Sequence, residues 1–222
     1  MVPTDRTATT RRATLPYGRT PMSEAEFSDA WAAADAIQPS ELRDRISAML
    51  MLARGAGASA ADLRYVAGTD IVTLADAGTW VECRRPGFER RVPVSVRFAE
   101  DLQRMARQAR RETLIGERGQ PLPLPAADPD HLAEQLHAQV CLGRPDALIT
   151  IERLRRAWWV EQLGGALPVR EFLCVTGEES WGIVRELSDF CPAPMMDAPQ
   201  LARLMGGAAA LELVDLETWG LD

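Results

Sequence analysis

Apolar residues recur along this chain with two different spacings. From residue 23 to residue 66 they follow the three-to-four-residue spacing of a buried helix face, as Phe27 and Trp31 illustrate. Between residues 71 and 94, short β-branched runs alternate with glycine-containing turns, which indicates strands. The helical spacing returns after that segment. The pattern predicts an α+β fold that is mainly α, with a small three-stranded antiparallel sheet.

Capping residues and helix breakers set the expected ends of these elements. Ser23 with Glu26 forms a capping box, Ser40 suits the N-cap of the next helix, and Gly177 suits a helix C-cap. We expect helices over residues 23–37, 40–54, 59–66, 95–111, 130–142, 151–164, 168–176, 179–190 and 201–205. We expect strands over residues 71–74, 79–83 and 90–94. The expected domains are a flexible arm over residues 1–20, a globular domain over residues 21–206 and an acidic, apolar tail over residues 207–222.

The charge is distributed unevenly along the chain. The formal net charge is −7 and the pI is about 5.0, which argues against an obligate nucleic-acid-binding protein. Residues 84–120, however, carry ten arginines against five acids, whereas residues 186–222 carry seven acids against a single arginine. The middle of the chain is therefore basic and its end is acidic.

Composition narrows the possible chemistry. The sequence contains no apolar run long enough to cross a bilayer and no charged-then-apolar leader, so we expect a cytoplasmic protein without a membrane segment. Its four cysteines are far apart, and His131 and His137 occupy no motif position. These side chains do not match the spacing of metal ligands, so we expect no metal and no cofactor.

The stretch from Ile151 to Glu178 carries the candidate chemistry. A helical stripe centred on Leu154-Arg155-Arg156 is followed by a glycine turn, a second helix and Gly177. This succession resembles the second half of the catalytic domain of the tyrosine recombinases (phage integrases), where a H-x-x-R pair precedes a helix, a turn, another helix and a Gly-His or Gly-Trp pair. Upstream, residues 55–71 (GAGASAADLRYVAGTDI) are similar to the family's G-x-R-x-x-E-L…D-I pattern. The resemblance implies the recombinase catalytic-domain fold over roughly residues 21–190.

The family's reaction needs residues that this chain lacks. A tyrosine attacks a DNA phosphate, two arginines clamp the phosphate oxygens, and a lysine and one or two histidines move protons. Here Arg155 takes the place of one arginine, Ser59 falls where the other belongs, and Glu152 and Glu178 fall on histidine positions. Both tyrosines lie upstream of Arg155, and the sequence contains no lysine. The resemblance therefore implies an inactive relative with no catalytic residue and with degenerate catalytic positions at Ser59, Glu152, Arg155 and Glu178.

Two functional hypotheses follow, and they differ in the partner. The first is a DNA-binding accessory or regulatory factor that contacts the phosphates of duplex DNA, without sequence preference, through Arg84, Arg85, Arg90, Arg91, Arg153, Arg155 and Arg156. Glu152 and Glu178 weaken this hypothesis, because they would pair with Arg155 and repel phosphate.

The alternative is a protein–protein interaction or oligomerisation module that kept the fold without DNA binding. It would use residues 208–222 to reach a second copy or another protein. A third option is a different enzyme that uses Glu152 and Glu178 for acid–base chemistry beside Arg155, and no second signal in the sequence supports it.

Overall fold

The structure, a computed structural model, describes residues 17–75, 77–117, 128–140, 148–165, 168–178 and 182–191. All of them belong to one unit, Met1–Cys191. The helix predicted over residues 201–205 and the tail predicted over residues 207–222 lie outside the described residues. Within the described residues, no helix is both long and apolar enough to cross a membrane.

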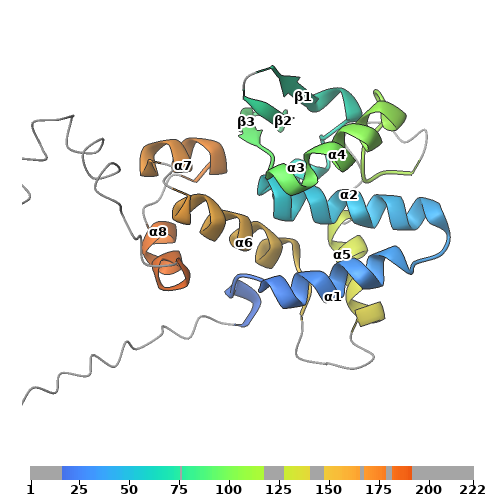
Figure 1. The fold of residues 1–222 in the computed structure, drawn as a ribbon, viewed down its shortest axis with the longest axis horizontal. Helices are drawn as coiled ribbons and strands as arrows, with labels where there is room; N and C mark the ends of the chain where they lie inside the picture. The colour runs from blue at the N-terminus through green and yellow to red at the C-terminus, as the bar shows by residue number, and fades with distance from the viewer. Residues whose placement is uncertain are drawn as a thin grey trace, which may run out of the picture. The chain divides into compact units, whose positions relative to one another are not determined.

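Helices and short 3₁₀ turns make up most of the described chain (Figure 1), and the three strands fall together in its first half. In chain order the elements are η1 (Tyr17–Arg19), α1 (Glu24–Asp35), α2 (Ser40–Ala56), α3 (Ala60–Leu63), η2 (Gly68–Asp70), β1 (Ile71–Leu74), β2 (Gly78–Cys83), β3 (Arg90–Pro93), α4 (Val96–Ala109), α5 (Asp128–Val140), α6 (Ile151–Gly164), α7 (Val169–Thr176), α8 (Gly182–Leu187) and η3 (Ser188–Phe190). The predicted fold class is confirmed.

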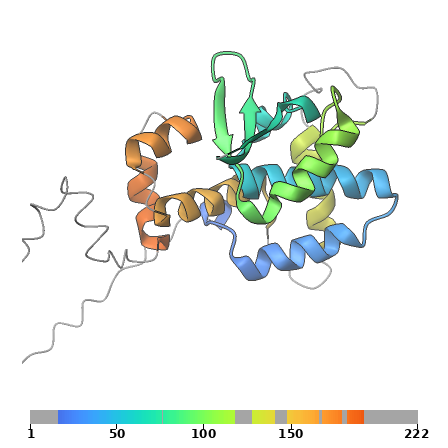
Figure 2. The same cartoon turned by 45° about the horizontal axis from the view of Figure 1, so that its top comes forward.

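Helix α2 lies at the centre of the core. Every residue from Ala48 to Ala56 is buried, including the charged side chain of Arg54. A helix that is enclosed on all sides needs neighbours all round, and α2 packs against α1, α4, α5 and α6. Both views show α2 running between α4 on one side and α1 on the other (Figures 1 and 2).

The sheet is antiparallel, with strand order β1–β2–β3. Its register pairs Ile71 with Val81 and Val81 with Val92, and the two valines are fully buried. Because side chains alternate between the faces of a strand, Thr79 points to the same face as Val81. Gln103 of α4 donates a hydrogen bond of 2.6 Å to the Thr79 hydroxyl, so α4 covers this face. The turn between β2 and β3 projects away from the helices (Figure 2).

Capping residues mark several of the helix ends. Ser23 caps α1, and the Glu26 carboxylate accepts a hydrogen bond of 2.8 Å from the Ser23 backbone, as the capping box predicts. Gly177 closes α7 with φ of 70°. The cap predicted at Ser40 is wrong, because α2 begins at that residue and Pro39 is the N-cap. The helix predicted over residues 59–66 is confined to Ala60–Leu63.

Gly57 joins the core to the helix that carries the candidate site. It ends α2 in the left-handed region, with φ of 59°, a conformation that costs glycine little. A Cβ atom at this position would lie 2.3 Å from Cε3 of Trp158 in α6. The fully buried Trp158 therefore packs directly on backbone, and this contact fixes α6 beside the end of α2.

Replacing Gly57 with alanine should destabilise the fold by about 2–4 kcal/mol, through the left-handed conformation and the clash with Trp158. Gly78 is the matched control, because its φ is 77° and a Cβ there would meet nothing within 4 Å. Gly78→Ala should cost only about 1 kcal/mol. Urea unfolding of both variants measures the difference, and equal losses would contradict the packing described here.

Candidate functional site

Arg155, the one arginine retained from the motif, binds the ends of two other helices. It lies on α6, which begins after Thr150, whose hydroxyl accepts a hydrogen bond of 3.2 Å from the Arg153 N–H. The Nε of Arg155 donates to the Gly57 carbonyl at 3.1 Å, and the Nη2 of Arg155 donates to the Thr176 carbonyl at 2.9 Å. These carbonyls stand at the C-terminal ends of α2 and α7, where backbone acceptors lack helical partners and the helix dipole favours a cation.

Two carboxylates and an aromatic ring complete the surroundings of Arg155. Glu178 Oε1 lies 3.2 Å from Nη2, and Glu152 Oε2 lies 3.9 Å from Nη1. The guanidinium carbon stands 4.2 Å from the ring centroid of Trp159. The side chain is only 12% exposed, and this burial lowers its pKa while the two glutamates oppose the change. The chain's own acids thus occupy positions from which they neutralise Arg155.

Ser59, which the resemblance assigns to the position of the family's first arginine, caps a helix in this fold. It is the N-cap of α3, and its hydroxyl donates a hydrogen bond of 2.6 Å to Oδ2 of Asp62. Asp62 is 1% exposed, and Arg90 of β3 binds both of its oxygens, at 3.1 and 2.7 Å. Burial would raise the pKa of Asp62, but Arg90 and the Ser59 hydrogen bonds lower it below its ordinary value. This buried carboxylate is therefore held in its charged form.

Arg90 connects this ion pair to the surroundings of Arg155. Its Nε donates to the Val175 carbonyl at 3.0 Å, and a Cβ atom on Gly177 would lie 3.4 Å from its guanidinium. The structure thus brings Glu152, Arg155 and Glu178 into one cluster. Ser59 follows two residues after Gly57, whose carbonyl binds Arg155.

Arg153 and Arg156 point into the protein from the same helix. Arg153 is 2% exposed, and it donates to the carbonyls of Thr20 and Leu148 and to Glu26 at 2.6–2.9 Å. Arg156 is 4% exposed and binds Glu152 at 2.7 Å and Glu186 at 2.8 Å. The structure gives these two side chains a role in holding α6 to its neighbours.

Two arginines of the β2–β3 hairpin reach towards solvent, and a third is partly buried. The side chains of Arg84 and Arg91 are 61% and 65% exposed, and both pair with Glu82 at 2.9 Å. Arg84 also places its Nε 2.6 Å from Oδ1 of the buried Asp70. The partly buried Arg85 lies over the ring of Phe88, with 3.9 Å between its guanidinium carbon and the ring centroid. Glu82 is itself partly exposed and a pair of this kind contributes little to stability, so phosphate is able to compete for Arg91.

Sequence reasoning missed the Asp62–Arg90 pair and the role of Glu186. The S-x-x-D spacing of Ser59 and Asp62 signals a capping box, but nothing local connects it to a strand 28 residues later. Cys83, also in this region, is buried, and burial raises the pKa of its thiol to about 12. A thiol with that pKa is unreactive at neutral pH.

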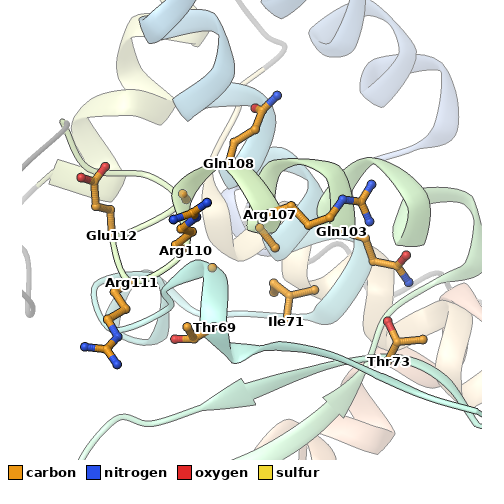
Figure 3. A pocket seen from close by; sticks show the side chains of 12 residues that line it. Thr69, Ile71, Thr73, Gln103, Arg107, Gln108, Arg110, Arg111 and Glu112 are labelled. Carbon is orange, nitrogen blue, oxygen red and sulfur yellow. The ribbon is translucent and has the colours of Figure 1, made fainter.

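An open hollow of about 930 Å³ lies between η2, β1 and the end of α4, with none of the Arg155 cluster in its lining. In the close view, Thr69, Ile71 and Thr73 line one side, and Gln103 and Arg107 of α4 line the other (Figure 3). The basic residues of the lining are Arg107, Arg110 and Arg111, and its one acid is Glu112. With Ile71, Ala106 and Ala109 also in the lining, the hollow combines apolar surface with a net positive charge.

The described residues contain no group of three His, Cys, Asp or Glu side chains arranged to hold a metal ion. His131 is exposed on α5, within 3.7 Å of Glu134 and 3.0 Å of the Gln135 amide.

Comparison with known proteins finds the same fold in solved recombinase structures. No protein-family model matches the sequence, and no curated protein matches it either. The crystal structure of XerA recombinase superposes with a TM-score of 0.58 at 13% identity, covering 89% of this chain and 65% of that one. XerH site-specific recombinase, bound to a palindromic difH substrate, gives 0.61 at 15% identity, covering 84% of this chain and 52% of that one.

A lambda integrase dimer bound to a COC′ core site gives a TM-score of 0.53 at 18% identity, covering 86% of this chain and 67% of that one. The chain thus spans about half to two-thirds of the length of these proteins. Its fold is that of the tyrosine recombinase catalytic domain, as the residue pattern predicts.

The Asp62–Arg90 pair should make stability depend on pH. Because the pKa of Asp62 is lowered in the folded state, the stabilisation is present above its unfolded pKa, near pH 4, and is lost as the pH falls through the lower folded value. Asp62→Asn leaves Arg90 without its counter-charge and should cost about 3 kcal/mol at pH 7.

The difference between Asp62→Asn and the parent protein should shrink as the pH falls below 4, which urea unfolding at several pH values measures. Asp101→Asn is the control, because that carboxylate is half exposed and pairs with Arg104 at 3.0 Å. It should change stability little at any pH. A loss in Asp62→Asn that stays constant down to pH 2 would show that the charge of Asp62 is not the source.

Proposed function

We propose that this chain is a recombinase-like protein that binds duplex DNA through its phosphates without cutting it, as an accessory or regulatory factor. One observation carries the proposal: Arg155 is enclosed by Glu152, Glu178 and two helix-end carbonyls. A guanidinium in that setting has its charge balanced and its donors engaged before a phosphate arrives. The strand-transfer step of the tyrosine recombinases needs those donors for the transition state.

Three features support the proposal that the chain does not cut DNA. Ser59 offers a hydroxyl in place of a second guanidinium, and that hydroxyl is already bonded to Asp62. The chain has no lysine, and no tyrosine follows Tyr65. A phosphotyrosyl intermediate would need an attacking tyrosine hydroxyl near Arg155. Tyr65 is the last tyrosine of the sequence, and it lies one turn beyond Asp62, with its N–H bonded to the Asp62 carbonyl.

The exposed hairpin supports DNA binding. Arg84 and Arg91 present charge to solvent, whereas Arg90, Arg153, Arg155 and Arg156 are largely buried against their own partners. We therefore place the phosphate contacts on Arg84, Arg85 and Arg91. XerH and lambda integrase, which share the fold, were crystallised on DNA.

The proposal predicts salt-sensitive binding that depends on the hairpin. A fluorescence titration of a short duplex should give a log K that falls with log salt concentration. Replacing Arg85 and Arg91 with glutamine should reduce the slope by up to about 2, one unit for each lost phosphate contact. Arg84 and Arg90 stay unchanged in this variant, because each binds a buried carboxylate, Asp70 and Asp62 respectively, that would be left without its counter-charge.

The matched control is Arg43→Gln with Arg104→Gln, which removes the same charge from side chains that pair with Asp44 and Asp101. This control should leave the slope nearly unchanged. Absence of binding at low salt would contradict the DNA proposal. Covalent capture of a nicked DNA substrate would contradict the proposed inactivity.

A second candidate function, protein interaction, is favoured by the hollow at the end of α4. We propose as its occupant the acidic, apolar segment 208–222 of a second copy, giving a homo-oligomer. That segment contains four acids and no basic residue. Its leucines and carboxylates complement the apolar surface of the hollow and the charges of Arg107, Arg110 and Arg111.

Light scattering should then show a dimer that is lost in a chain ending at Gly207 and in an Arg107→Glu/Arg111→Glu variant. Adding Glu212→Arg and Asp215→Arg to the second variant should restore the dimer, because the charges are exchanged between the two surfaces. Arg43→Glu/Arg104→Glu serves as the charge control and should remain dimeric. A parent protein that is monomeric at all concentrations would exclude this candidate.

A further inference from the structure

The tip of the β2–β3 hairpin presents an aromatic ring to solvent from a fixed turn. Phe88 is 45% exposed, and it is the one aromatic among the exposed large hydrophobic side chains of the described residues. The turn runs from Arg85 to Phe88, closed by a hydrogen bond of 2.9 Å from the Phe88 N–H to the Arg85 carbonyl. Pro86 and Gly87, whose φ is 78°, suit the two central positions of a type II turn.

Hydrogen bonds within the hairpin hold this tip in place. The Gly87 N–H donates to Glu89 Oε1 at 3.2 Å, and Arg90 Nη1 donates to the Phe88 carbonyl at 3.3 Å. The same Arg90 binds the buried Asp62, so the backbone that carries Phe88 is tied to the core. A tip fixed in this way loses little conformational entropy when it binds.

One cation lies on the ring and two more belong to the same hairpin. Arg85 stacks on the ring at 3.9 Å, while Arg84, which follows β2, and Arg91 of β3 are exposed. A solitary exposed phenylalanine is ordinary on a protein surface. An aromatic ring at the end of a fixed turn, in a hairpin that carries three arginines, is a combination suited to nucleic acid, because the ring can stack on a base while the cations bind phosphates.

We infer that Phe88 stacks on an unpaired base, so that the hairpin recognises DNA in which a base step is disrupted in preference to regular duplex. The inference rests on the proposed DNA-binding function and names the form of DNA that it selects. In a regular duplex both faces of each base are covered, and a wedge must first separate two stacked bases. At a single-nucleotide bulge this separation has already occurred, so the stacking contact adds to the affinity.

The stacking of Phe88 on an unpaired base can be tested with two DNA duplexes of equal length, one fully paired and one with a central bulged 2-aminopurine. This base is fluorescent, and stacking quenches its emission. The parent protein should bind the bulged duplex about tenfold more tightly and change its 2-aminopurine emission. Phe88→Ala should bind both duplexes with the affinity of the paired one. Phe88→Tyr should keep the preference, because it retains an aromatic ring.

The outcomes separate this inference from the proposed function. Equal binding of both duplexes by the parent protein would overturn the inference and leave phosphate binding intact. A preference for the bulge that persists in Phe88→Ala would also overturn it, since the discrimination would then come from elsewhere. Binding of neither duplex would overturn the inference together with the proposed function. Thermal melting of both variants confirms that the exposed position tolerates the substitutions.

Discussion

The contact between Arg155 and two helix ends is the constraint on which the candidate site depends. A buried guanidinium is tolerated only where its donors find acceptors and its charge is balanced. Here the carbonyls of Gly57 and Thr176 supply acceptors, and Glu152 and Glu178 supply negative charge. Arg155 therefore acts as a cap shared by α2 and α7. Arg155 thus holds the ends of two helices together in this chain.

This use of Arg155 is consistent with the net charge of the chain. An enzyme that stabilises a phosphate transition state gains from donors that are preorganised and have no other anion to bind. In this structure Arg155 already has two anions beside it, the carboxylates of Glu152 and Glu178. Glu152 also pairs with Arg156. The acids around Arg155 are part of the excess of acids that gives the chain a net charge of −7. Positive charge available to a partner lies at the hairpin and along the end of α4.

The sequence predicted the strands from their local pattern, and it predicted the pairing of Arg155 with Glu152 and Glu178 from the resemblance, which implies one shared site for the three residues. It did not predict that Arg153 and Arg156 are buried, since their acceptors include the carbonyls of Thr20 and Arg19, more than 100 residues away. Charged residues read as exposed unless such partners are known. Val96 shows the opposite case: it is apolar, yet it is 92% exposed at the start of α4, where Phe98 is buried instead.

Arg90 shows why the site and the hairpin depend on each other. One guanidinium binds the buried Asp62, the Val175 carbonyl next to the Arg155 cluster, and the Phe88 carbonyl at the hairpin tip. A change that loosened the Asp62 pair would release the tip as well, because both contacts use Nη1. The same ion pair that occupies the interior therefore keeps the exposed arginines and Phe88 in a fixed arrangement. The burial of these charges thus gives the exposed hairpin a rigid support.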